Sequence, residues 1–121
     1  MEYKLLGRNK DIALIQSTDV LIQDVQSALD FIATAQYETG CDQYILYKSC
    51  VADGFFILST GLAGAVLQKF VTYGKRLAVV GDYAKYTSRP LHAFIYESNR
   101  GGSVFFVSTV EEAVAKLEGT A

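Results

Sequence analysis

The fold is decided by the stretch Leu77-Ala78-Val79-Val80-Gly81-Asp82, in which an uninterrupted apolar run meets a turn signal. A strand that alternates apolar and polar residues keeps one face in solvent, whereas a strand that is apolar throughout is covered on both faces. The stretch Tyr44-Ile45-Leu46-Tyr47 is a second run of this kind. Together the two runs predict a mostly parallel central sheet with helices packed against it.

Amphipathic helices are expected beside these strands. Apolar residues that recur at the i, i+3, i+4 spacing mark one core-facing stripe of a helix. Before the run at 44–47, this stripe consists of Val25, Ala28, Leu29, Ile32, Ala33 and Tyr37, with Gly40 at the expected helix end. Between the two apolar runs, it consists of Leu62, Val66, Phe70 and Tyr73, with Gly74 at the end.

The beginning and the last third of the chain add further elements. The short apolar runs 3–6 and 12–15 surround a turn that contains Gly and Asn, which predicts an N-terminal β-hairpin. After the second apolar run, Ser88 is a plausible N-cap, and Pro90 is tolerated in the first turn of the helix that follows.

A strand and a helix close the chain. Residues 104–107 form the last apolar run, and Thr109 and Glu112 have the spacing of a capping box before a final helix. The expected order is β-β-α-β-α-β-α-β-α. It describes a single layered α/β domain over residues 1–121, with a mostly parallel central sheet, an N-terminal hairpin and flanking helices.

The composition excludes several classes of protein. Half of the 121 residues are hydrophobic and a fifth are charged, which provides enough apolar surface for a core. Eleven Lys and Arg against thirteen Asp and Glu give a net charge of −2, so a nucleic-acid partner is not expected. The longest uncharged run, 54–68, is shorter than the roughly 20 residues that span a membrane, and the first residues lack the order of a signal peptide. We therefore expect a cytoplasmic protein without a membrane partner.

Metal and thiol chemistry are also not expected. Cys41 and Cys50 flank an expected strand, so they lie too far apart for a disulfide. The one histidine, His92, is distant from both in the sequence, and no HxxxH or CxxC pattern is present. A catalytic Cys50 is the less favoured alternative to an inert thiol. The expectation is two reduced thiols, with no metal, no cofactor and no catalytic residue set.

The loops that leave the carboxyl ends of the strands are expected to meet at one edge of the sheet. In parallel α/β folds, ligands bind at this edge. We call it the rim, and its expected ligand- or partner-binding residues are Lys48, Ser59, Thr60, Asp82, Lys85 and Tyr86. Ser and Thr at helix starts also act as N-caps, and Asp is common in turns, so a purely structural role is the alternative for these residues.

The helix start Leu58-Ser59-Thr60-Gly61-Leu62 carries the most information along the rim. A phosphate on Thr60 or Ser59 would lie at the positive end of the helix dipole, among free amides. It would add about −1.5 to −2 charge units and so block or recruit a partner. The alternative is a capped helix that packs closely on the sheet through Gly61 and Gly64.

Both the order of elements and this helix start resemble the STAS domains of bacterial anti-sigma-factor antagonists. In those domains Asp-Ser-Ser-Gly-Leu-Gly opens the second helix, and the second serine is the phosphorylated switch. The resemblance implies that Thr60 takes the switch position, with Ser59 before it. Leu58 stands where the motif has aspartate, and Ala63 stands where it has its second glycine.

Over nearly its whole length the chain more closely resembles an uncharacterised bacterial family, domain-of-unknown-function family 4180. The matching strings include Asp24-Val25-Gln26-Ser27-Ala28-Leu29-Asp30, Leu67-Gln68-Lys69-Phe70, Val80-Gly81-Asp82-Tyr83, Lys85-Tyr86-Thr87-Ser88 and Phe94-Ile95-Tyr96-Glu97-Ser98-Asn99-Arg100-Gly101. The resemblance supports the fold and supplies no mechanism.

The rim supports two hypotheses about function. The first is a non-enzymatic, STAS-like regulatory or interaction module that binds an unknown protein partner. The alternative is a binder of a small anionic ligand, or a minor enzyme. In that case Asp82 is the acid/base candidate, and Lys48 or Lys85 holds the anion.

A third hypothesis is assembly into a homodimer. Phe55, Phe56 and Ile57 form an apolar run that would mark an interface if it were exposed. The alternative is that the run folds back and covers the core.

Overall fold

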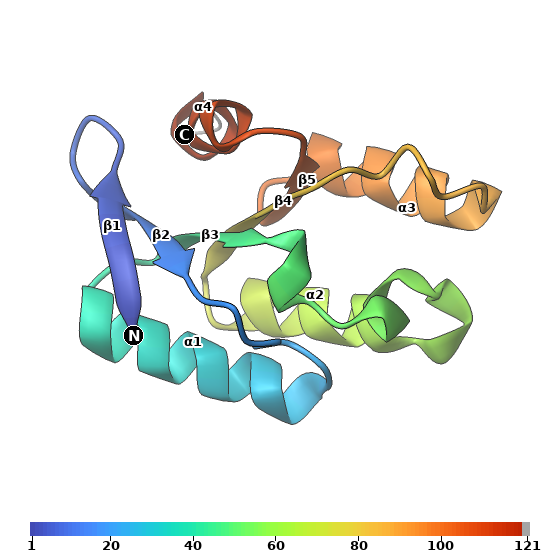
Figure 1. Ribbon diagram of the computed structural model, residues 1–121, viewed down its shortest axis with the longest axis horizontal. Helices are drawn as coiled ribbons and strands as arrows, with labels where there is room; N and C mark the ends of the chain where they lie inside the picture. The colour runs from blue at the N-terminus through green and yellow to red at the C-terminus, as the bar shows by residue number, and fades with distance from the viewer. Residues whose placement is uncertain (120–121) are drawn as a thin grey trace.

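A five-stranded sheet runs through the centre of the protein, whose computed structural model describes residues 1–119 (Figure 1). The strands lie side by side in chain order, the first pair antiparallel and all later pairs parallel. This confirms the expected α/β class and the N-terminal hairpin. The strands are β1 (Glu2–Leu6), β2 (Ile12–Gln16), β3 (Gln43–Tyr47), β4 (Arg76–Val80) and β5 (Val104–Val107).

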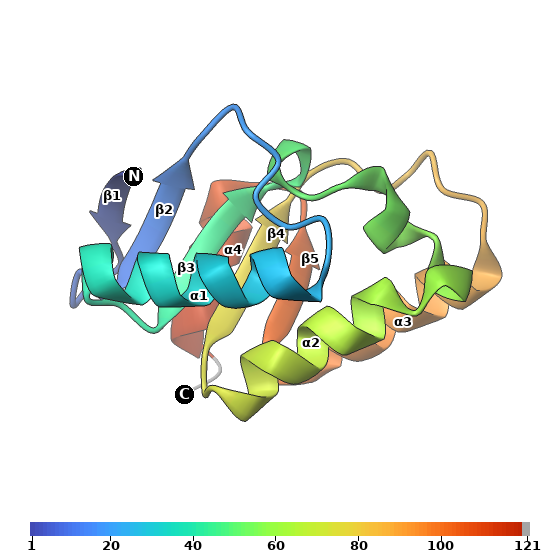
Figure 2. The same ribbon diagram turned by 90° about the horizontal axis from the view of Figure 1, so that it is seen from below.

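The helices cover the two faces of the sheet unequally (Figure 2). Crossovers of one hand between neighbouring parallel strands place their helices on the same face. Accordingly α1 (Val25–Thr39), α2 (Leu62–Thr72) and α3 (Arg89–Arg100) share one core with alternate strand residues. The last helix, α4 (Val110–Gly119), packs on the opposite face against β3, β4 and β5.

The buried stripe of α1 differs from the expected one. The buried residues are Ala28, Phe31, Ile32 and Ala35, whereas Ala33 is exposed and Tyr37 is 90% exposed. The ring of Phe31 packs edge-on against Tyr44 of β3, with the centroids 5.5 Å apart. That contact rotates the helix so that Phe31 and Ala35 face the sheet and Tyr37 faces solvent.

The start of α1 is fixed by a capping box. Asp24 is the N-cap: its carboxylate accepts from Ser27 N–H at 2.7 Å, and the Ser27 hydroxyl accepts from Asp24 N–H at 3.0 Å. This reciprocal pair is a capping box. The helix ends at Gly40, as expected, in the left-handed conformation with φ 71°.

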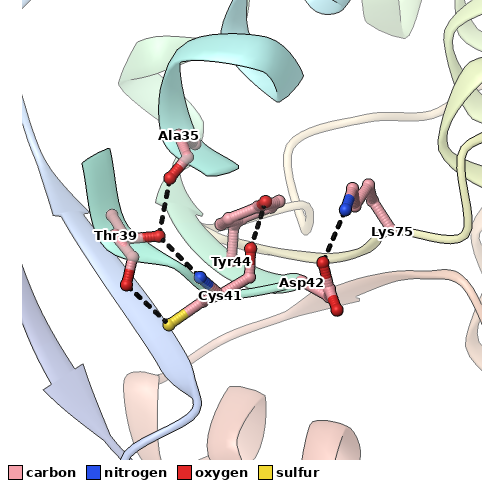
Figure 3. A network of polar contacts seen from close by, with 6 residues as sticks. All are labelled: Ala35, Thr39, Cys41, Asp42, Tyr44 and Lys75. Atoms are coloured by element: carbon pink, nitrogen blue, oxygen red, sulfur yellow. Dashed lines mark hydrogen bonds and ion pairs between the residues drawn. The ribbon is translucent and has the colours of Figure 1, made fainter. Parts of the chain in front are cut away.

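A network of polar contacts fixes the end of α1 to β3 and to the start of β4 (Figure 3). Thr39 Oγ1 donates to Ala35 O and accepts from Cys41 N–H, and Tyr44 Oη donates to Cys41 O. The buried ammonium of Lys75 pairs with Asp42 at 2.5 Å. Burial, with smaller contributions from Asp42 and Cys41, raises the pKa of Tyr44. The network joins three segments at the end of the sheet opposite the rim.

The segment between β3 and α2 folds as three short 3₁₀ turns, Lys48–Cys50, Asp53–Phe56 and Leu58–Thr60. Phe55 and Phe56 are only 3% and 4% exposed, whereas Ile57 is 55% exposed. Phe55 and Phe56 therefore fold back onto the core, where both phenyl rings pack against Phe106 of β5. Of the three residues considered for a homodimer, Ile57 alone is exposed.

Within residues 1–119, each helix is too short or too polar to cross a membrane. Cys41 and Cys50 are free cysteines, and both are buried.

Candidate functional site

The structure brings three of the expected rim residues into one hollow. Lys48 directly follows β3, and Asp82 and Lys85 follow β4, so the parallel strands carry them to the same edge. They line a hollow of about 460 Å³ together with Val20, Ser49, Val51, Ala52 and Asp53.

A second hollow of about 460 Å³ lies next to the first. Ser59, Lys85 and Tyr86 belong to its lining, so Lys85 borders both hollows. The remaining lining residues are Phe56, Ile57, Leu58, Thr87, Ser88, Pro90 and Leu91. Thr60 lines neither hollow.

The position of Lys48 is fixed by its neighbours. Its stem crosses Gly81 so closely that a side chain at position 81 would collide with it. Its ammonium lies 4.9 Å from the ring centroid of Phe56 and 5.0 Å from that of Tyr86. A cation over an aromatic face is attracted by the ring quadrupole. No Asp or Glu within residues 1–119 forms an ion pair with Lys48.

Lys85 is an exposed second cation beside the same aromatic ring. Its ammonium lies 5.6 Å from the centroid of Tyr86, and the described chain offers it no acidic ion-pair partner either. Tyr86 is stacked on Phe56 at 5.5 Å with an interplanar angle of 22°. The two lysines therefore form a charged spot on a stacked aromatic support, in a hollow that Asp53 and Asp82 also line.

The other titratable groups of the rim have structural roles. Asp82 accepts from Ala84 N–H at 2.9 Å, the geometry of a turn. Tyr83 Oη donates to Val79 O at 2.8 Å, and burial, with a smaller contribution from Tyr86, raises the pKa of Tyr83. Burial also raises the pKa of Cys50, so this thiol stays protonated at neutral pH. Tyr83 and Cys50 are therefore poorly suited to acid/base or nucleophilic chemistry.

Ser59 and Thr60 differ in the hydrogen bonds and the exposure of their hydroxyl groups. Thr60 Oγ1 donates to the Ile57 carbonyl at 2.9 Å and accepts from Leu62 N–H at 3.2 Å. Gly61, with φ 77°, is the N-cap of α2. Ser59 is exposed and borders the hollow that Lys85 also lines.

The sequence indicated the charged members of the rim and missed their supports. Gly81 was assigned only to a turn. Phe56 was considered for a homodimer interface or as cover for the core, and not as a support for Lys48. The sequence signal for Gly81 was its position directly after the apolar strand 77–80. At the same end of the neighbouring strand β3, the next residue is Lys48, which has a long side chain. Ser49 and Asp53 complete the first hollow. Over residues 1–119, no cluster of three His, Cys, Asp or Glu is arranged to hold a metal ion.

A family model described as "Domain of unknown function (DUF4180)" matches residues 7–117. No curated protein and no solved structure matches the chain. The likeness to STAS domains stays a prediction.

Proposed function

Since the chain belongs to the DUF4180 family, whose description carries no activity, we propose a function from the geometry of the rim. The protein is a non-enzymatic interaction module, and its rim binds an acidic segment of a partner protein. Lys48 and Lys85 contact the negatively charged groups, and Tyr86 supports both lysines.

One observation carries this proposal: the ammonium of Lys48 lies on two aromatic rings and has no acidic partner in the described chain. A surface lysine ordinarily extends into water. Here the absence of a side chain at Gly81 lets the stem lie flat, so the charge is held at one place. A fixed charge loses less side-chain entropy when an anion binds than a mobile one does.

The geometry favours binding over catalysis. The Tyr83 hydroxyl is held by the Val79 carbonyl, and the Asp82 carboxylate accepts a hydrogen bond from Ala84 N–H within a turn, so both side chains have structural roles. An acidic segment that crosses both hollows would contact Lys48 in the first and Lys85 at their shared border. Electrostatic complementarity of this kind contributes to specificity and to the rate of association.

Phosphorylation at the start of α2 offers a means of regulation. Ser59 suits it better than Thr60, because Ser59 borders the hollow that Lys85 lines and the Thr60 hydroxyl is engaged with the backbone. A phosphate on Ser59 would compete with the acidic segment for Lys85. In this proposal phosphorylation weakens partner binding.

A second candidate function is the binding of a small anionic metabolite. The observation in its favour is the size of the first hollow, about 460 Å³, which lies in the usual range of small-molecule pockets, roughly 300–1,000 Å³. Ser49 lines it beside the two lysines and would add a hydroxyl donor.

The test is affinity capture from native lysate with three baits: the wild-type protein, the double variant Lys48→Met/Lys85→Met, and the control Lys69→Met. Methionine keeps the length of the side chain and removes the charge. We expect one or more acidic proteins to bind the wild type and the control but not the double variant. Identical captured sets for all three baits would contradict the proposal.

Two further measurements separate the alternatives. Ser59→Glu should reduce capture of the same partner, whereas Ser59→Ala should leave it unchanged. Thermal shift with inorganic phosphate and with citrate tests the second candidate. The small-anion function would be favoured by two results together. One is that phosphate or citrate stabilises the wild type but not the double lysine variant, and the other is that no protein is captured in a charge-dependent way.

A further inference from the structure

The strand β1 leaves one edge of the sheet open. It lies at the end of the strand order, with β2 on one side and no element of residues 1–119 on the other (Figures 1 and 2). Residues 2–5 are exposed. The outward backbone N–H and C=O groups of an edge strand are a template for pairing with another strand.

The opposite edge, formed by β5, is closed by a side chain. The Asn99 carboxamide of α3 accepts from Phe106 N–H at 2.7 Å and donates to Phe106 O at 3.0 Å. One residue thus satisfies both outward backbone groups of Phe106, as a neighbouring strand would. A further strand is therefore obstructed at Phe106 of β5, whereas no element of residues 1–119 covers the outer side of β1.

The side chains of β1 form two different faces. Tyr3 and Leu5, which pair with Ile15 and Ala13, lie on the face that α1 covers, and the Tyr3 hydroxyl donates to Glu38 O of that helix. Met1, Tyr3 and Leu5 are 40%, 36% and 39% exposed, a large exposure for apolar side chains that alternate along an edge. Glu2 and Lys4 lie on the other face.

We propose that β1 pairs antiparallel with β1 of a second copy of this chain, about a two-fold axis at Tyr3. Residues opposite each other then have numbers that sum to six. Glu2 lies opposite the partner's Lys4 and Lys4 opposite the partner's Glu2, which gives two cross-strand ion pairs on one face. On the other face Met1 lies opposite the partner's Leu5, and the two Tyr3 rings meet.

Charge complementarity selects this register. Moving the axis to Lys4 would place the two Lys4 side chains opposite each other and Glu2 opposite the partner's Leu6, which removes both ion pairs. The axis at Tyr3 pairs opposite charges on one face and apolar side chains on the other. Because Asn99 closes the β5 edge, the pairing ends at a dimer instead of continuing into a filament.

The dimer is expected to be weak. A strand pair of this length contributes a small interface, below the roughly 1,200 Å² of total buried surface at which stable complexes begin. Sedimentation equilibrium from about 1 µM to about 1 mM covers the corresponding range of dissociation constants.

The test uses charge reversal on β1. Lys4→Glu and Glu2→Lys each place like charges opposite each other twice, so each should weaken the dimer by about tenfold or more. An equimolar mixture of the two single variants restores every opposite-charge pair across a heterodimer, and it should associate about as strongly as the wild type. The double variant Glu2→Lys/Lys4→Glu should behave in the same way.

Arg89→Glu, at an exposed residue on α3, changes the net charge by the same amount as Lys4→Glu and should leave association unchanged. Far-ultraviolet circular dichroism of each variant checks that the fold is kept. A wild-type protein that stays monomeric to the highest concentration overturns the proposal. So does a dimer that Lys4→Glu and Glu2→Lys weaken no more than Arg89→Glu does, since its contact would then lie elsewhere.

Discussion

The side chain of Lys48 lies directly across Gly81: a Cβ atom at position 81 would be 2.5 Å from Lys48 Cβ and 2.8 Å from Lys48 Cδ. Carbon atoms in favourable contact are about 3.5–4.0 Å apart. The two residues leave neighbouring parallel strands, so the path of the lysine depends on the missing side chain of the glycine.

Gly81→Ala should therefore displace Lys48 and destabilise the protein. We expect a loss of about 1–3 kcal/mol in the free energy of unfolding, the usual cost of overpacking, measured by urea denaturation. Gly64→Ala is the control, because a Cβ there meets nothing within 4 Å and position 64 lies inside α2. That change should stabilise the protein by about 0.5–1 kcal/mol. Equal effects of the two substitutions would contradict the contact.

Tyr86 supports the charged spot through its ring and not through its hydroxyl. Tyr86→Phe keeps the stacking on Phe56 and the surface beneath Lys48, so stability should change by less than about 0.5 kcal/mol. Tyr86→Ala removes both contacts and should cost about 1–3 kcal/mol. Capture of the acidic partner should survive the first change and fail after the second. Loss of capture in Tyr86→Phe would assign recognition to the hydroxyl instead.

Asn99 should stabilise the protein and also limit its assembly. Asn99→Ala leaves the N–H and C=O of Phe106 without their side-chain partner, and we expect a loss of about 1–3 kcal/mol. Light scattering should show larger, concentration-dependent species, because the second edge of the sheet is then open. Gln68→Ala, which removes one exposed bond to Thr72, is the control and should change neither quantity measurably.

Asp24 should make part of the stability depend on pH. Hydrogen bonds from the Ser27 backbone and then from its side chain hold the pKa of Asp24 below its usual value. The stabilisation from the ionised cap is therefore fully present above the unfolded pKa, about 4, and is lost as the pH falls through the lower folded value.

Asp24→Asn keeps a cap without an ionisable group. Its unfolding free energy should fall less steeply than that of the wild type between about pH 5 and about pH 2, measured by chemical denaturation. Asp24→Ala, which removes the cap, should be less stable than Asp24→Asn at every pH. A parallel decline in the wild type and Asp24→Asn would show that Asp24 does not titrate as its geometry predicts.

The sequence was sufficient for most of the fold because local signals and the global topology agree. Apolar strands without alternation require cover on both faces, and Gly40 and Ser88 mark helix ends through backbone geometry and capping. The orientation of α1 was not predictable in this way. Ala33 and Phe31 both fit an apolar stripe, and the packing of Phe31 on Tyr44 decided which of them is buried.

The residues of the candidate site were likewise predictable only in part. Lys48, Asp82 and Lys85 could be assigned to one edge from the sequence, because the carboxyl ends of parallel strands lie together. The burial of Phe56 could not be predicted from the sequence, since a run of three apolar residues in a loop fits an exposed cluster and a folded-back one equally well. Contact with Phe106, far along the chain, decided between them.

By itself, the sequence determined that this is a single α/β domain with polar residues gathered at one edge of its sheet, since strand and helix periodicity are local properties of the chain. The tertiary structure alone decided that Lys48 crosses Gly81 onto two rings, that Asn99 bonds the outward backbone groups of Phe106, and that no element of residues 1–119 covers the outer side of β1. Each of these depends on segments that are distant in sequence meeting in space, and no local pattern encodes such a meeting.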